Sequence, residues 1–217
     1  AGFDIADMDL MANEYLQKGK DMAKKLNWDK AIAQYYYYKG LSEQLSSEYD
    51  SAGLYYDTAI LYFKQSSAKA ITKKKKEEIA LEIANTMSEK AANLMKIGRG
   101  AESITIYLHA LELWKASNQP RKTEAIGTFY EKIATSYYDM KQFDKSLYYD
   151  KLSLEQRLLS NNEEVIAWAY VYVCDDFISL NQMDSCLVYL NLAMPLVKRL
   201  NNHRLSVQYY NKLAQVS

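Results

Sequence analysis

Residues 130–153, YEKIATSYYDMKQFDKSLYYDKLS, decide the fold. A small residue, Ala134, lies late in one segment with helical apolar spacing, and a second small residue, Ser146, follows twelve positions later in the next segment. Bulky Tyr130 precedes the first small residue by four positions, and small Ser153 follows the second by seven. Two helices approach closely only where their facing side chains are small. This stretch therefore predicts a tight antiparallel pair of helices.

The same spacing recurs along the chain, which indicates a repeat protein. In four places two small residues stand twelve positions apart, with a bulky residue four positions before the first and a small one seven after the second. The four pairs of small residues are Gly40 and Ala52, Ala91 and Ser103, Ala134 and Ser146, and Cys174 and Cys186. With Ala214 as a fifth starting point, the intervals between first small residues are 51, 43, 40 and 40 residues. Self-similarity at a nearly fixed period is typical of stacked repeats.

Apolar residues recur at intervals of three and four throughout, and short polar breaks such as Asn181-Gln182 separate the segments. This pattern predicts about ten helices, at residues 6–26, 29–46, 48–66, 75–97, 100–117, 121–140, 143–160, 163–180, 183–200 and 203–217. Short loops make neighbouring helices antiparallel. The first interval exceeds the later ones by about eleven residues, and we expect the excess to form a longer connection at Ser66–Lys76, SSAKAITKKKK.

The repeat resembles the tetratricopeptide repeat family, on Tyr36-Gly40, Ala52-Tyr56-Ala59 and Tyr130-Ile133-Ala134-Tyr137. Its period of about 40 residues resembles the long-helix type found in bacterial sensory and regulatory proteins. The resemblance implies an all-α, right-handed superhelical solenoid of antiparallel helix pairs. A single domain over 1–217 would comprise a cap or half repeat at 6–26, repeats at about 29–66, 75–117, 121–160 and 163–200, and a half repeat at 203–217. Because that last helix has no partner helix, we expect a fragment of a longer protein.

Composition excludes several classes of function. Lys plus Arg (27) equal Asp plus Glu (27), which argues against nucleic-acid binding by this segment. Seven Gly and two Pro are too few for an all-β fold or for Gly-rich phosphate loops. No apolar run approaches the roughly 18 to 20 residues that span a bilayer. Both the bacterial cytoplasm and the periplasm stay open as locations.

Few residues indicate chemistry. His109 and His203 lack metal-spaced partners, and no nucleophile, base and orienting group can be assembled, so we expect neither a metal, a cofactor nor catalysis. Asp175 and Asp176 are interpreted as solvated or groove-lining side chains. Cys174 and Cys186 occupy facing small positions, so their sulfurs should be neighbours. Reduced thiols are the favoured state, whereas a disulfide would indicate an oxidising compartment.

The resemblance places a ligand on the concave face formed by the first helix of each pair. In the family, this face is lined by the residues three before and one after the first small residue. The candidate binding residues are Tyr37, Leu41, Val171 and Asp175, with Tyr138 and Trp168 beside them. The matching positions elsewhere are Ser88 and Ala92, Glu131 and Thr135, and Asn211 and Gln215. Tyr138 and Trp168 could instead pack against neighbouring repeats.

These expectations favour a protein-binding or peptide-binding module over an enzyme. Exposed Tyr and Trp suit a protein or an extended peptide as partner. The basic and Asn residues with which chaperone-binding members hold a terminal carboxylate are absent from the matching positions. The resemblance implies the sensory or interaction region of a larger bacterial signalling or transcription-regulatory protein. A free-standing scaffold or adaptor is the alternative, and an all-α enzyme is a remote one.

Overall fold

The computed structural model describes residues 5–160 and 162–216. Within those residues the chain forms ten α-helices and no strand, which confirms the all-α prediction. The helices are α1 (Ile5–Lys25), α2 (Asp29–Leu45), α3 (Tyr49–Lys69), α4 (Lys73–Lys96), α5 (Gly100–Lys115), α6 (Lys122–Asp139), α7 (Phe143–Leu158), α8 (Glu163–Ser179), α9 (Met183–Leu200) and α10 (His203–Val216).

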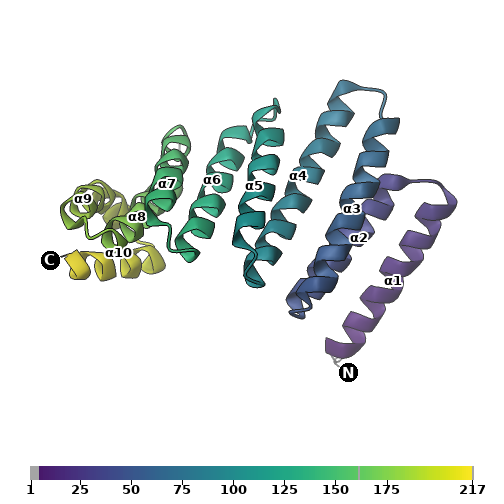
Figure 1. The fold of residues 1–217 in the computed structure, drawn as a ribbon, viewed down its shortest axis with the longest axis horizontal. Coiled ribbons are helices and arrows are strands. Elements are labelled where there is room, and N and C mark those ends of the chain that lie inside the picture. Colours follow the sequence, from purple (N-terminus) through teal and green to yellow (C-terminus); the bar gives the residue numbers. More distant parts are fainter. Residues whose placement is uncertain (1–4, 161, 217) are drawn as a thin grey trace. The chain divides into compact units, whose positions relative to one another are not determined.

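The chain divides into two compact units, residues 1–113 and 114–217, and each is described by itself. In the first unit α2 packs on α1 and α3, and α4 packs on α3, so helices adjacent in sequence lie side by side (Figure 1). In the second unit α7 packs between α6 and α8, while α10 contacts both α8 and α9. The antiparallel pairs are therefore as predicted. The single solenoid domain and its right-handed path stay predictions.

A residue in the left-handed backbone conformation follows the first helix of each pair. Ser47, Gly98, Lys141 and Asn181 all have positive φ angles, between 57° and 77°. The N–H of the next residue then donates to a carbonyl five residues back, as from Gln182 to Phe177 at 2.8 Å. This is the Schellman ending, which caps the last carbonyls of a helix and turns the chain sharply. The connections within pairs therefore need only three residues, and the predicted polar breaks mark them.

The small residues spaced twelve apart form the contact within each pair. The Ser103 hydroxyl donates to the Ala91 carbonyl at 2.7 Å, and the Ser146 hydroxyl donates to the Ala134 carbonyl at 3.0 Å. In the fourth pair the Cys174 sulfur lies 3.6 Å from the carbonyl oxygen of its facing residue, Cys186. Both cysteines are buried and both thiols are free. Hydroxyl and thiol groups at these positions therefore join the two helices where alanine would only allow close approach.

The prediction of a long connection at Ser66–Lys76 is wrong. Helix α3 continues to Lys69 and α4 begins at Lys73, so only three residues connect them. The segment contains no Gly or Pro, and its Ala and Lys residues favour helix. Thr72 caps α4 by accepting a hydrogen bond from the Lys75 N–H at 3.2 Å. The extra residues therefore lengthen two helices.

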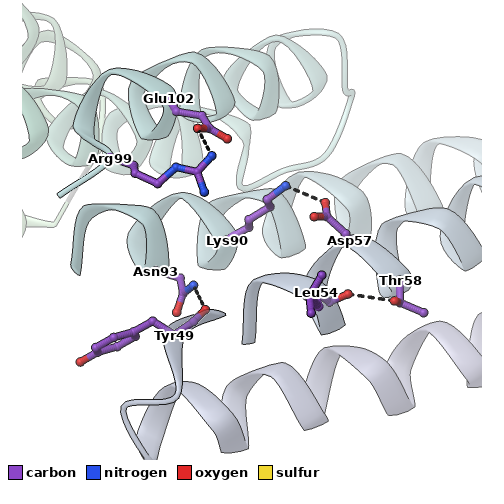
Figure 2. Close-up of polar contacts among 8 residues, drawn as sticks. All are labelled: Tyr49, Leu54, Asp57, Thr58, Lys90, Asn93, Arg99 and Glu102. Carbon is purple, nitrogen blue, oxygen red and sulfur yellow. Dashed lines mark hydrogen bonds and ion pairs between the residues drawn. The ribbon is translucent and has the colours of Figure 1, made fainter. Parts of the chain in front are cut away.

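Polar side chains also join one pair to the next, as Figure 2 shows for the first unit. The buried side-chain amide of Asn93 on α4 donates to the Tyr49 carbonyl of α3 at 2.6 Å, and Lys90 pairs with Asp57 at 2.6 Å. Asn93 lies two positions after Ala91, the first small residue of its pair. This position therefore contacts the second helix of the preceding pair.

Hydropathy adds one finding to the fold. No helix within residues 5–160 and 162–216 combines the length and the apolar character that crossing a bilayer requires.

Candidate functional site

The second unit contains a groove of about 440 Å³ between helices α6, α7 and α8. Its lining residues are Glu131, Thr135 and Tyr138 from α6, Ser146 and Asp150 from α7, and Tyr172 and Asp175 from α8. The three α6 residues are spaced by four and three, so they share one face of the helix. The two residues on α7 are four positions apart and the two on α8 are three positions apart, so each of these two sets also shares one helix face.

The groove exists where a bulky residue is replaced by a small acid. The position four residues after the second small residue holds Tyr56, Tyr107 and Leu190 in three pairs, each buried in the interior. In the remaining pair this position is Asp150. A carboxymethyl side chain fills much less space than a phenol or an isobutyl group. Asp150 therefore leaves room beside α6 and α8 that the other pairs fill.

Two of the acids on the groove wall already have basic partners. Glu131 forms an ion pair with Arg157 of α7, and Asp175 forms one with Lys212 of α10. Lys212 is only 6% exposed, so its ammonium group depends on the Asp175 carboxylate. These two pairs hold their members in place and leave little net charge.

Asp150 has a second acid as its neighbour instead. Asp176 of α8 is 0% exposed and lies against Asp150 and Ser146. The Ser146 hydroxyl gives its one proton to the Ala134 carbonyl, and no N–H or hydroxyl of the described residues donates to either carboxylate oxygen of Asp176. Among the described groups, the neighbouring Asp150 carboxyl group is the one that could donate a proton to Asp176.

Burial raises the pKa of Asp150 well above the ordinary range for a carboxyl group, and the negative charge of Asp176 raises it further. Burial raises the pKa of Asp176 as well. Two carboxyl groups this close cannot both ionise at low cost, so they share one proton. The raised pKa of Asp150 keeps this carboxyl group protonated at neutral pH, so it can serve as a hydrogen-bond donor toward Asp176.

Aromatic side chains form the rim of the groove. Tyr138 and Tyr172 are 36% and 37% exposed, and both are amphipathic, with an apolar ring and a polar hydroxyl. The Tyr138 hydroxyl is 3.1 Å from the Ser179 hydroxyl. The Tyr172 ring stacks on Trp168 at 5.4 Å, and the Arg204 guanidinium lies 5.8 Å from the Trp168 ring. Trp168 therefore supports Tyr172 from outside the groove.

The structure brings some of the predicted binding residues together, and others belong to the first unit. Tyr138 and Asp175 line the groove, and Trp168 stacks on a lining residue. Tyr37 and Leu41 belong to the first unit, where Tyr37 is half-buried and packs against Tyr38 and Tyr56 with ring centres 5.3 and 6.3 Å apart.

Val171 is the candidate that the structure contradicts. Its side chain is 0% exposed and belongs to the apolar core of the second unit, together with Leu190 and Leu205. One residue further along α8, Tyr172 points to the groove instead. A shift of one residue rotates a side chain by about 100° around a helix, which is enough to move it from the core to a surface. The family register was therefore off by one residue at this position.

Sequence reasoning missed Asp150 and Tyr172 and misinterpreted Asp176, which is buried and not solvated. A signal for Asp150 was present, because an acid stands where three aligned repeats have Tyr, Tyr and Leu. Among the residues that the structure describes, no three His, Cys, Asp or Glu side chains are grouped to hold a metal ion.

Paired antiparallel helices with small contact positions define the fold class of tetratricopeptide-like helical repeat proteins, and this chain has that fold. No family model and no curated protein matches the sequence. Solved structures match it well: a putative kinesin light chain from Podospora anserina with TPR-like repeats is 10% identical, with a TM-score of 0.64 over 84% of each chain.

Three further solved structures are also similar. BtubC (BKLC) from P. vanneervenii is 13% identical, with a TM-score of 0.73 over 89% of this chain and 74% of its own. The apo form of RapI is 14% identical, with a TM-score of 0.74 over 92% of this chain and 68% of its own. Aspartyl phosphate phosphatase F from Bacillus subtilis is 14% identical, with a TM-score of 0.73. The match covers 93% of this chain and 49% of the phosphatase.

Proposed function

We propose that this chain is a binding module that holds a protein segment or an extended peptide in the groove between α6, α7 and α8. The observation that carries the proposal is the groove itself, an open volume of about 440 Å³ with two half-exposed tyrosines at its rim. Ligand sites commonly occupy roughly 300 to 1,000 Å³ and combine apolar walls with a few fixed polar groups. Tyr is among the residues that contribute most to binding at interfaces.

The charged walls support the same proposal. Glu131 and Asp175 are each held by a basic partner, so their positions are fixed before a ligand arrives. Side chains that are already ordered lose little conformational entropy on binding, which favours affinity. Thr135 and the tyrosine hydroxyls add hydrogen-bonding groups that suit the N–H and C=O groups of an extended backbone.

We further propose that the module catalyses no reaction. The pair Asp150 and Asp176 is the one arrangement with an unusual protonation state, but Asp176 is completely buried and only Asp150 lines the groove. In glycosidases and aspartic proteases both carboxyl groups of the pair face the substrate, whereas here only one does. The role in this proposal is the sensory or interaction region of a larger bacterial signalling or regulatory protein. The fold likeness to RapI and phosphatase F supports that role.

Tyr172→Ala is expected to weaken peptide binding at least tenfold, because it removes the larger part of one groove wall. Peptides would first be selected with the wild-type chain from an array of random heptapeptides. Their dissociation constants would then be measured by fluorescence polarisation.

Tyr148→Ala is the matched control for this experiment. Tyr148 lies on α7, is well exposed and does not line the groove, so its removal should leave the affinity unchanged. Equal affinities of wild type, Tyr172→Ala and Tyr148→Ala, with all three folded by circular dichroism, would contradict binding in this groove.

A further inference from the structure

The groove contains a charge that nothing in the described structure balances. Four acids lie at or directly behind its surface, and two of them, Glu131 and Asp175, are paired with Arg157 and Lys212. The other two are Asp150, which lines the groove, and Asp176 directly behind it. A completely buried carboxylate without a donor is costly unless a cation or a proton compensates it. The structure therefore has a place where a positive group would be stabilised.

Two independent observations point to this place. The first is the cavity, which exposes Asp150 at the position where other pairs carry a large apolar side chain. The second is Asp176, whose completely buried carboxyl group receives no hydrogen bond from an N–H or hydroxyl group of the described residues and whose neighbours, Asp150 and Ser146, both line the groove. Asp176 therefore lies directly behind the part of the groove wall that Asp150 and Ser146 form.

We propose that the groove selects peptides that carry a cationic N–H donor, either a Lys or Arg side chain or a free amino terminus, and that this donor binds at Asp150. The proposal rests on the peptide-binding function above. Tyr138 and Tyr172 lie on either side, from α6 and α8, and their rings can contact the aliphatic part and the charge of such a donor. An acidic or neutral side chain would leave the buried charge without a partner.

Binding of the cationic donor replaces the proton on Asp150 with the positive charge of the ligand. In the free chain a single proton lies between the carboxyl groups of Asp150 and Asp176. When an ammonium or guanidinium group donates to Asp150, that carboxyl group releases its proton to solvent, and both acids become ionised. The total charge of the site is the same before and after the exchange. The complex therefore forms with the release of up to one proton.

The charged and titratable groups around Asp150 explain why the exchange of a proton for a ligand cation takes place at this carboxyl group. Glu131 faces it from α6, and Asp175, Asp176 and Tyr172 face it from α8. Two nearby bases, Arg157 on its own helix and Lys212 on α10, are each paired with an acid, and Arg204 lies over the Trp168 ring outside the groove. Every charged neighbour that shifts the pKa of Asp150 is an acid, and each raises it. A cation from the ligand is therefore the missing counter-charge.

The test uses the heptapeptides selected with the wild-type chain, synthesised with a free or an acetylated amino terminus. We expect Lys or Arg to be enriched at one position, or binding to require the free terminus, and the two forms distinguish these sources. Replacing the basic group by Ala, or acetylating the terminus, should weaken binding at least tenfold. The affinity should rise with pH by up to tenfold per unit between pH 5 and 7, with proton release seen by calorimetry in two buffers.

Two variants and one control make the test decisive. Asp150→Asn should abolish the pH dependence, and the double variant Asp150→Asn with Asp176→Asn should also lose the preference for a basic group. Asp144→Asn removes an exposed acid from the same helix and should change neither property. Binding that requires Tyr172 but shows no basic preference, or a preference that survives the double variant, would overturn this inference and leave the peptide-binding function intact. Failure of every selected peptide to depend on the groove would overturn both.

Discussion

Gly40→Ala is expected to lower the free energy of unfolding by about 1–3 kcal/mol, the usual cost of overpacking a core contact. A Cβ atom at this position would lie 2.6 and 2.8 Å from the Cε1 and Cδ1 atoms of Tyr56. Tyr56 is completely buried, and its hydroxyl donates to Gln44 at 2.8 Å, so the ring is held in place. The glycine at this first small position is therefore required by the contact between α2 and α3.

Gly53→Ala is the control, because it makes the same chemical change in the same pair of helices. A Cβ atom there would meet only the Asn93 side chain, at an ordinary 3.7 Å. Replacing a helical glycine by alanine should then raise the free energy of unfolding by up to about 1 kcal/mol. Urea unfolding followed by circular dichroism measures both changes. Equal effects of the two substitutions would show that the small positions are not close contacts.

Asp150→Asn is expected to stabilise the folded chain by about 1–3 kcal/mol at pH 7.5. An asparagine amide can donate permanently to Asp176, whereas the wild-type carboxyl group must retain a proton that it would lose in the unfolded chain. While Asp150 stays protonated, each pH unit above its ordinary pKa costs up to about 1.4 kcal/mol. Asparagine carries no such cost.

The sign of the pH dependence follows from the raised pKa. Asp150 binds its proton more tightly in the folded chain than in the unfolded chain. Its contribution to stability is therefore fully present below the unfolded pKa of about 4 and is lost progressively as the pH rises toward the folded pKa. The gap in stability between Asp150→Asn and wild type should thus be small near pH 4 and widen toward neutral pH.

Urea titrations of both proteins between pH 4 and pH 8 measure this gap. Comparing the two proteins at each pH cancels the pH dependence that they have in common. Asp144→Asn should track the wild type within about 0.5 kcal/mol, because Asp144 is exposed on the same helix. A gap that narrows as the pH rises, or a destabilised Asp150→Asn, would contradict the shared proton.

The sequence predicted contacts within pairs much better than contacts between them. The twelve-residue spacing located the small residues, such as Ala134 and Ser146, and the polar breaks located the Schellman turns. Both features depend on residues close in sequence. The prediction for Ser66–Lys76 was wrong because the extra residues of the first repeat interval were assigned to a loop. Residues that favour helix and the Thr72 cap extend the two helices instead.

The site was predicted only in part, for a physical reason. Tyr138 and Asp175 were found from the repeat register, which fixes the general direction of a helix face. That direction is accurate only to about one residue. Buried Val171 was therefore assigned to the surface in place of its neighbour Tyr172, which lines the groove. Asp150 and Asp176 meet across two pairs, and their distance depends on how one pair packs on the next. Spacing within a pair carries no information about that packing.

Binding to a chain whose groove has been filled is the most direct test of the central claim. Thr135 is exposed, lines the groove and lies outside the core, so Thr135→Trp should fill the space without unfolding the chain. Thr105→Trp, at an exposed position on α5 that does not line the groove, is the control. With the peptides selected by the wild-type chain, binding at the groove predicts at least a hundredfold loss of affinity for Thr135→Trp and none for Thr105→Trp. Unchanged binding by folded Thr135→Trp would contradict it.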